Sequence, residues 1–371
     1  MPFLSGRIGS MSLSIGIVGL PNVGKSTLFN ALTDAEALAA NYPFATIEPN
    51  TGIVPVPDSR LDVLQQMYAA EKVIPAAVTF VDIAGLVAGA SKGEGLGNKF
   101  LANIRETNAI IHVVRAFENG DILRHDTSPV DPKSDIDIIN TELILADLET
   151  IDKRLVSLAK EAKSSPAARE RLGYIESLKR HLEESTPLSA LPSLDTDAIS
   201  DLHLLTAKPV IYVFNVSEDE LADTNKKSEL ERLVAPAKCV FVSAKLEEEL
   251  KGLDASDQTE LLESYGVQES GLTQIIHAAY DTLGLQSYLT AGPKEVRAWT
   301  IHKGDKAPQA AGAIHGDFEK GFIAAVIVDY DDLVAAGSES AARAAGKLRT
   351  EGKEYVMQPG DIVEFRFNVS K

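Results

Sequence analysis

The sequence of 371 residues has one cysteine, few aromatic residues and no long apolar run. A single cysteine, Cys239, excludes an internal disulfide and a cysteine zinc site, and it fits a reducing compartment. No apolar run approaches the roughly 18 residues that a membrane-spanning helix needs. Residues 1–10 contain one arginine and no long apolar stretch, which excludes a secretory signal. We therefore expect a cytoplasmic protein with no membrane partner.

Basic residues are also few relative to acidic ones, with 36 Lys/Arg against 54 Asp/Glu. The net charge of −18 argues against general nucleic-acid binding by the chain as a whole. From Ala291 onward 11 Lys/Arg stand against 12 Asp/Glu, a balance of −1, so residues 1–290 carry the remaining −17. We expect residues 1–11 to be a disordered extension, with Met11 as an alternative start. The length of the chain leaves room for two or three domains.

What the sequence does contain is a phosphate-binding motif, GLPNVGKS, at residues 19–26. A β-branched segment, residues 13–18, precedes it, and good helix formers follow in residues 27–33. A strand, a Gly-x4-Gly-Lys-Ser turn and a helix form a loop whose N–H groups and helix N-terminus bind a polyphosphate. A chance glycine-rich turn is the alternative, and both flanks count against it. The predicted nucleotide-binding residues of the loop are Asn22, Val23, Gly24, Lys25, Ser26 and Thr27.

Two side chains of the loop and three residues beyond it have predicted roles in catalysis and Mg²⁺ binding. Lys25 is placed to reach the β- and γ-phosphates as the catalytic lysine, and the Ser26 hydroxyl is placed to ligate Mg²⁺. Thr46 is the best candidate for a second hydroxyl ligand. Asp82, at the end of the next apolar strand, holds Mg²⁺ through water, and Gly85 offers its N–H to the γ-phosphate. This Asp-x-x-Gly position favours a switch hydrolase over nucleoside and shikimate-type kinases.

The segment 85–97 is unusually rich in glycine. It is interpreted as a switch segment that the γ-phosphate orders, with a plain flexible loop as the alternative. Leu86 occupies the position where small signalling GTPases carry a glutamine that orients water. Because an apolar side chain cannot polarise water, catalysis must depend on another group.

The base-binding motif follows a later buried strand, residues 208–214, which ends in Asn215-Val216-Ser217-Glu218. Guanine-specific proteins carry Asn-Lys-x-Asp here, so Val216 replaces the lysine and Glu218 replaces the aspartate. The longer Glu218 spoils a bidentate fit to guanine, whereas the Asn215 amide can donate to N7 or pair with adenine. A turn or cap residue is the alternative for Asn215. The loop that backs the base is expected at Ser243-Ala244-Lys245, with Ser243 and Ala244 as its predicted nucleotide-binding residues.

Residues 19–26, 41–50, 82–100 and 215–218 together resemble the YchF/Obg-like ATPase family of translation-factor-class P-loop NTPases. The resemblance runs from about residue 12 to the C-terminus. It implies slow ATP and GTP hydrolysis with Mg²⁺, and a ribosome, large subunit or RNA partner. It also implies an α/β fold: a G-domain-like sheet, an inserted helical coiled-coil hairpin and a C-terminal β-grasp (TGS) domain. We expect a monomer.

The same resemblance suggests two groups that would act in place of the missing glutamine. One is K⁺ held by Asn22, as in potassium-activated relatives. The other is His125, in the loop 119–132, because a histidine side chain ordinarily titrates near neutral pH. A histidine in a loop is more often merely solvated.

The rest of the sequence fits that architecture on its own terms. Residues 133–200 contain two helical runs separated by Pro166, which predicts an antiparallel hairpin. The first run has an apolar seam at four-three spacing, formed by Ile144, Leu148, Ile151, Leu155 and Leu158. Basic residues near the hairpin tip could touch RNA phosphates, but they alternate with acids and a solvated face is equally consistent: Lys153, Arg154, Lys160, Lys163, Arg169 and Arg171.

The C-terminal region, residues 289–371, reads as a small mixed sheet. Three strands, 296–301, 322–328 and 362–367, and two alanine-rich helical pieces, 307–314 and 339–348, fit a β-grasp domain in size. Its segment 314–322 is similar to the TGS signature. The nucleotide-binding domain is then predicted at residues 12–132 and 201–288.

The leading functional prediction is a nucleotide-hydrolysing switch acting on or near the ribosome, with ATP preferred. An Obg-type GTPase is one alternative, and the residues at Val216 and Glu218 count against its guanine specificity. A nucleotide-gated adaptor with incidental hydrolysis is the other alternative, which the sequence alone does not exclude.

Overall fold

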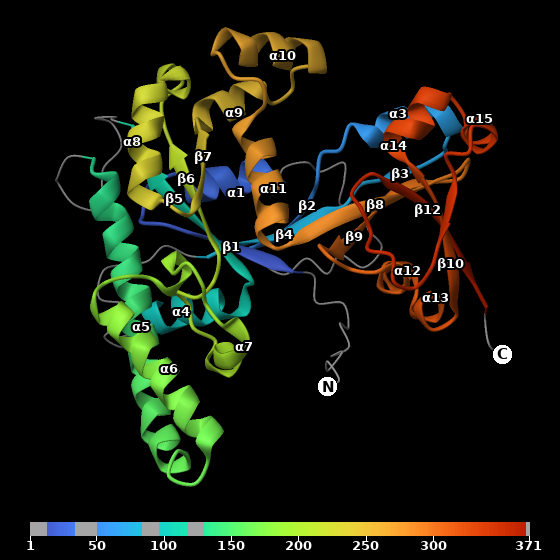
Figure 1. Ribbon diagram of the computed structural model, residues 1–371. Coiled ribbons are helices and arrows are strands. Elements are labelled where there is room, and N and C mark those ends of the chain that lie inside the picture. Colours follow the sequence, from blue (N-terminus) through green and yellow to red (C-terminus); the bar gives the residue numbers. More distant parts are fainter. Residues whose placement is uncertain (1–12, 34–49, 84–95, 118–129, 369–371) are drawn as a thin grey trace. The chain divides into compact units, whose positions relative to one another are not determined.

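The computed structural model describes residues 13–33, 50–83, 96–117 and 130–368 (Figure 1). Contacts within the chain divide it into two compact units. Among the described residues, the first unit contains 13–33, 50–53, 79–83, 96–117 and 130–279, and the second contains 54–78 and 280–368. None of the described helices has the length and apolar character that crossing a membrane requires.

The first unit is built on a six-stranded sheet in the order β2-β4-β1-β5-β6-β7. The strands from β4 to β7 are parallel. All seven residues of β5 are buried, as expected for a parallel sheet covered on both faces. The strand bounds are β1 Ser14–Val18, β2 Thr51–Pro55, β4 Ala77–Asp82, β5 Ala109–Arg115, β6 Val210–Asn215 and β7 Lys238–Val242.

Helices flank this sheet and begin where its strands end. Helix α1 contacts β1, and α8 contacts β7. Because the strands are parallel, the carboxyl ends of β1, β4, β6 and β7 lie at one edge, the usual ligand-binding edge of such sheets. The helices are α1 Lys25–Thr33, α4 Leu96–Glu106, α8 Thr224–Val234, α9 Ala244–Leu250, α10 Ala255–Ser264 and α11 Gly271–Thr282, with a short 3₁₀ turn η4 at Asp219–Ala222.

Two long helices, α5 (Pro132–Glu161) and α6 (Pro166–Glu183), pack against each other as the hairpin in Figure 1. Each begins with a proline after a capping side chain: Asp131 accepts from Ser134 N, and Ser165 accepts from Ala168 N. The predicted seam lies in their shared apolar cluster. The chain then returns to the sheet through η2 Leu188–Ala190, α7 Thr196–Ile199 and η3 Ser200–Leu202.

The base of this hairpin is fixed by a buried carboxylate. Asp147 accepts hydrogen bonds from Leu205 N (2.8 Å), Thr206 N (2.8 Å) and the Thr206 hydroxyl (2.7 Å). Burial raises the pKa of Asp147 against the opposing effect of these bonds. The carboxylate therefore joins helix α5 to the segment that enters β6.

The second unit has its own six-stranded sheet, in the order β11-β10-β12-β8-β9-β3. Strands β8 and β9, β10 and β12, and β10 and β11 pair antiparallel, whereas β12 with β8 and β3 with β9 pair parallel. Helix α12 contacts β9 and β10 and contributes three buried alanines to the core. The strands are β3 Val73–Ile74, β8 Leu285–Ala291, β9 Val296–His302, β10 Phe322–Asp329, β11 Arg349–Glu351 and β12 Asp361–Phe367; the helices are α12 Ala307–Ile314, α13 Gly316–Lys320, α14 Tyr330–Ala336 and α15 Glu339–Ala344.

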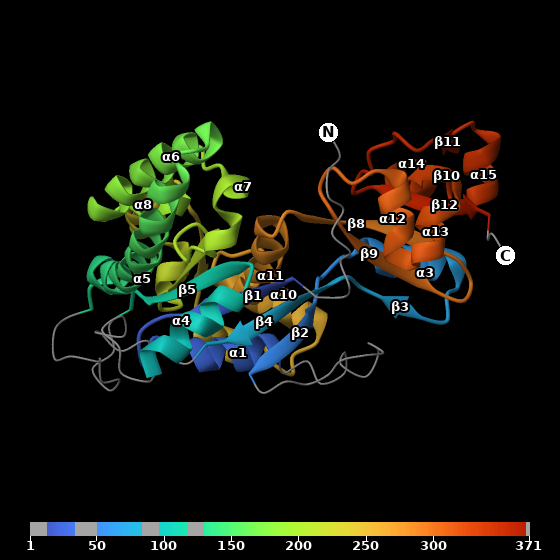
Figure 2. The same ribbon diagram turned by 90° about the horizontal axis from the view of Figure 1, so that it is seen from below.

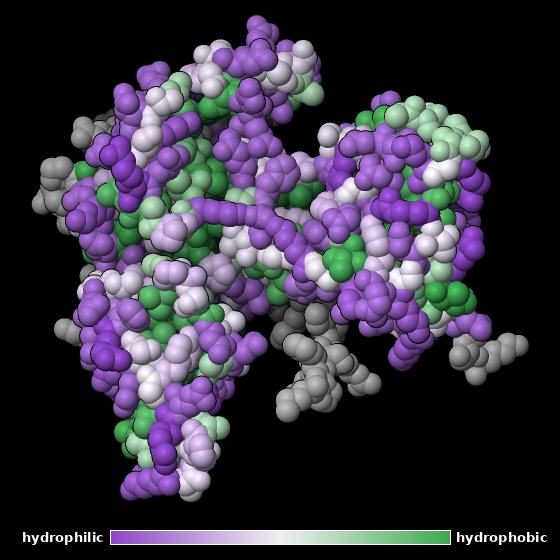
Figure 3. Space-filling model, in the orientation of Figure 1, coloured by the Kyte–Doolittle hydropathy of each residue, from purple (hydrophilic) through white to green (hydrophobic). Residues whose placement is uncertain are grey.

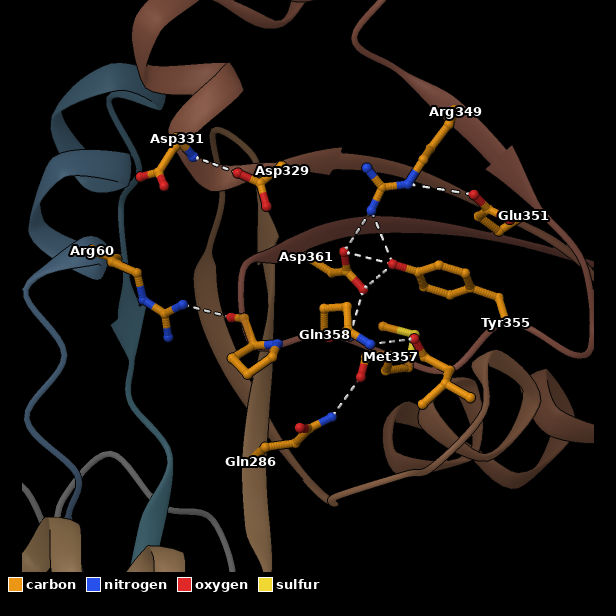
Figure 4. Close-up of polar contacts among 12 residues, drawn as sticks. Arg60, Gln286, Asp329, Asp331, Arg349, Glu351, Tyr355, Met357, Gln358 and Asp361 are labelled. Atoms are coloured by element: carbon orange, nitrogen blue, oxygen red, sulfur yellow. Dashed lines mark hydrogen bonds and ion pairs between the residues drawn. The ribbon is translucent and has the colours of Figure 1, made fainter.

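Residues 54–78, which precede the first unit's Asp82, form part of this second unit. They contain β3 and α3 (Arg60–Tyr68), drawn in blue among the orange and red elements in Figures 1 and 2. Arg60 donates to the Pro359 carbonyl at 2.5 Å, across 299 residues of sequence. Figure 4 shows this contact beside the buried Asp361, which accepts from Arg349, Tyr355 and Gln358 N.

These elements differ from the predicted boundaries in two places. Residues 54–78 fall inside the span 12–132 that the sequence assigns to the nucleotide-binding domain, yet they pack with the C-terminal sheet. Strand β8 begins at Leu285, ahead of the predicted boundary at 289. The extension 1–11 lies outside the described residues.

Candidate nucleotide-binding site

The phosphate loop connects β1 to α1, and its glycines are required by close approach. Gly24 has φ +101°, in the region that side chains disfavour, and a Cβ there would lie 2.7 Å from Asn215 Nδ2. At Gly19 a Cβ would lie 2.5 Å from the Val113 carbonyl. Asn22 also has positive φ, at 62°, which asparagine tolerates better than most residues. The backbone at these positions therefore leaves no space for a side chain at either glycine.

Lys25 follows this loop as the first residue of α1. Its side chain is buried, with 8% exposed, and Nζ donates to the Leu20 carbonyl at 2.7 Å. Burial lowers the pKa of Lys25, and the charge of Asp82 opposes this effect. A bound phosphate would compete with the Leu20 carbonyl for the ammonium, since charge-assisted contacts are the stronger ones.

Asp82, at the end of β4, and Ser26, at the start of α1, both lie beside Lys25. Ser26 hydrogen-bonds to the Asp82 carboxylate, and this bond and the Lys25 charge lower the carboxyl pKa; burial raises it and prevails. Asp82 Oδ1 is buried and has no hydrogen-bond partner among the described residues. An orphaned carboxylate oxygen beside a hydroxyl is a pair of hard oxygen donors, which fits Mg²⁺.

Asn215 connects the phosphate loop to the loop after β7. It is 5% exposed, its Nδ2 donates to the Val23 carbonyl at 3.2 Å, and its Oδ1 accepts from Ala244 N at 3.3 Å. The amide therefore has protein partners on both sides. Its neighbour Val216 is buried and donates its N–H to the Val242 carbonyl at 2.8 Å.

Glu218, in the loop after β6, forms an ion pair with Lys245. Lys245 Nζ is 2.5 Å from Glu218 Oε1, and the side chains are 72% and 16% exposed respectively. This contact lowers the pKa of the Glu218 carboxylate. Ser243, which is buried, caps α9 by accepting from Leu246 N at 3.3 Å and so fixes the helix turn that carries Lys245.

Two protein-family models match this chain. A family model described as a 50S ribosome-binding GTPase matches residues 14–160, and a YchF GTPase C-terminal model, described as a protein of unknown function, matches residues 285–368. The ribosome-binding ATPase YchF of Bacillus subtilis is 51% identical over 367 residues, covering 97% of this chain and all of its relative. That of Pasteurella multocida is 52% identical over 366 residues, with the same coverage.

A solved structure agrees. The Schizosaccharomyces pombe YchF GTPase superposes with a TM-score of 0.85 at 42% identity, covering 97% of this chain and 99% of its own. The chain belongs to the YchF family. A GTP-binding protein of Pyrococcus horikoshii, at 22% identity and a TM-score of 0.57, shares the fold.

YchF membership confirms the family and the P-loop α/β fold predicted from the sequence. Of the predicted site residues, Lys25, Ser26 and Asp82 lie together at one end of the site, and Asn215, Val216, Glu218, Ser243 and Ala244 lie in two adjoining loops. Thr46, Gly85, Leu86 and His125 lie outside the described residues.

Sequence reasoning placed Lys245 in the loop that backs the base but did not predict its pairing with Glu218, because Glu218 lies on a distant segment. It did not single out His112 at all. His112, in β5, is fully buried beside Tyr212, with ring centroids 5.2 Å apart. Burial lowers its pKa to about 3, so the imidazole is neutral at physiological pH. A histidine inside an apolar strand was the only available signal.

Proposed function

We propose that this YchF-family chain is an ATP-hydrolysing switch that binds the ribosome and prefers ATP to GTP. The observation that carries the proposal is the meeting of Lys25, Ser26 and the orphaned oxygen of Asp82 beside a loop that has no room for a side chain at Gly19 or Gly24. The relatives' names supply the class: ribosome-binding ATPases in Bacillus subtilis and Pasteurella multocida.

In this proposal the Ser26 hydroxyl would hold Mg²⁺ directly and Asp82 would hold it through water, with Thr46 as the third protein group. When bound, Mg²⁺ neutralises charge on the β- and γ-phosphates. The loop N–H groups and the start of α1 bind the phosphates, and the Lys25 ammonium exchanges the Leu20 carbonyl for phosphate oxygen. Gly85 donates its N–H to the γ-phosphate.

Water activation is assigned to one of two groups. K⁺ would be bound at Asn22, whose positive φ places it at the bend of the loop. His125 would act as a general base near neutral pH. Replacing each by alanine and measuring turnover in K⁺ and in Na⁺ separates them: loss of the K⁺ effect only in Asn22→Ala assigns the ion, and a rate drop only in His125→Ala assigns the histidine.

The partner is proposed to be the large ribosomal subunit, and the protein a cytoplasmic monomer. Basic residues of the helical hairpin give this limited support, because several already have acidic partners. Lys153 pairs with Glu149, Arg154 with Glu161, and Arg171 with Asp201. On the face shown in Figure 3 the hairpin is mainly hydrophilic, with small apolar groups between. The pairing of these basic residues with acids favours a solvated surface over a dedicated RNA-binding face.

A guanine-specific enzyme is the second candidate, because both matching family models and the fission yeast structure are named as GTPases. Turnover of ATP and of GTP, each with and without ribosomes, tests both. Faster ATP turnover that ribosomes change supports the proposal. A tenfold preference for GTP would overturn it, and no turnover with either nucleotide would favour a non-catalytic adaptor.

A further inference from the structure

The pairing of Lys245 with Glu218 is a feature of the base loops that the proposed function does not use. The two residues lie on different segments, one after β6 and the other in the first turn of α9. Both segments are fixed. Val216 N binds the Val242 carbonyl, Ala244 N binds Asn215 Oδ1, and Ser243 caps α9. These hydrogen bonds therefore hold side by side the two backbone segments that carry the ammonium and the carboxylate.

The pair contributes little to the stability of the fold. Lys245 is 72% exposed, and ion pairs at exposed positions contribute little to stability. Lys245 also has a second acid within reach on its own helix, Glu249, at 3.8 Å. The closer approach, at 2.5 Å, is to the mostly buried Glu218. The contact therefore matters chiefly because it places a hydrogen-bond donor beside the Glu218 carboxylate.

A carboxylate alone presents two acceptors, which match the two donors of guanine, N1–H and the N2 amino group. A carboxylate paired with an ammonium presents an acceptor beside a donor. That pattern matches adenine, whose N6 amino group donates and whose N1 accepts. The same arrangement disfavours guanine, because the ammonium, a donor, would face guanine N1–H, which is also a donor.

We propose that Lys245 is a specificity-determining residue, which turns the Glu218 carboxylate from a guanine-type into an adenine-type recognition group by pairing with it. The inference rests on the proposed nucleotide site and assigns to Lys245 the base preference of that site. Without the ammonium, Glu218 presents two acceptor oxygens at the position where guanine-specific proteins carry aspartate, and the preference for ATP weakens. The length of Glu218 alone is then not the whole cause of discrimination.

The test is equilibrium binding of labelled ATP, GTP and ITP to the full chain. Lys245→Ala is expected to shift the ATP-to-GTP affinity ratio about tenfold toward GTP, the scale of one base contact. Lys245→Arg keeps a cation and should retain most of the wild-type ratio. Glu249→Gln removes only the second acid and is the matched control, with an unchanged ratio. A ratio within twofold of wild type in Lys245→Ala would overturn the inference.

Two further measurements test whether Lys245 acts through Glu218 and whether it acts at N1 of the base. In a Glu218→Gln background, Lys245→Ala should change the ratio less than in the wild type, since no carboxylate remains to be paired; an equal change would overturn the role through Glu218. ITP has N1–H but no N2 amino group, so Lys245→Ala should improve ITP and GTP together. Improvement of GTP alone would overturn the assignment to N1. A wild-type chain that binds no nucleotide would instead refute the proposed function.

Discussion

The two ends of the nucleotide site are built in opposite ways. The phosphate end is local: residues 19–26 make a continuous loop between one strand and one helix, and its lysine is buried. The base end is assembled from residues 215–218 and 243–245, and its lysine is largely exposed. The difference teaches that the phosphate end is fixed by backbone shape, whereas the base end is set by side-chain pairing and is easier to alter.

The phosphate end should therefore show the largest effect of a single substitution. Lys25→Ala is expected to lower turnover about 100-fold or more, the scale of losing one preorganised donor. The fold should survive, because the change acts on charge at the site and removes no apolar side chain from the core. Steady-state turnover and a thermal melt measure the two quantities, with the exposed Lys353→Ala as the control. Intact turnover, or an unfolded protein, would refute the assigned role.

Asp82→Asn probes the same end through the metal. Removing the carboxylate charge beside Ser26 should weaken Mg²⁺-dependent nucleotide binding about 10- to 100-fold, as for other groups that orient metal ligands. Titrations of labelled ATP with Mg²⁺ and with EDTA provide their own control, because the variant and the wild type should converge without the metal. An equal loss in EDTA would show that Asp82 acts on the fold instead.

The link between the two ends is Asn215. Asn215→Ala leaves the Val23 carbonyl and Ala244 N without their partners, which should lower the free energy of unfolding by about 1–3 kcal/mol. Chemical denaturation measures this, and the exposed Asn225→Ala is the matched control, with an expected change within about 0.5 kcal/mol. If Asn215→Ala is as stable as that control, the two loops are positioned by other contacts.

The same contrast explains what the sequence could and could not predict. The phosphate loop, Asp82 and the hairpin seam are visible because apolar runs, glycines and a four-three repeat are short-range patterns. The contact of Arg60 with Pro359 spans 299 residues, and β3 is only two residues long, so neither leaves a local signal. Lys245 and Glu218 are likewise two ordinary charges until β6 and β7 are placed side by side.

Glu218→Asp alters the base end directly. A side chain shorter by one methylene loses its contact with Lys245 and should shift the affinity ratio up to about tenfold toward GTP. Competition between labelled ATP and GTP measures the shift. Adding Val216→Lys restores the guanine motif, but Val216 is buried, so the double variant should also lose stability. A wild-type ratio in Glu218→Asp would show that the base preference is set elsewhere.

The smallest expected effect separates the two ends most sharply. Ser243→Ala removes the cap that Leu246 N binds at the start of α9, at a cost of about 1 kcal/mol in unfolding free energy. Because this helix turn carries Lys245 but no phosphate ligand, the ATP-to-GTP ratio should fall while turnover with saturating ATP stays near wild type. Denaturation, competition binding and turnover are measured together, with Ser256→Ala, on the exposed start of α10, as the control. A drop in turnover with an unchanged ratio would mean that the two ends are not independent, because only a rigid connection through Asn215 would carry the change to the phosphates.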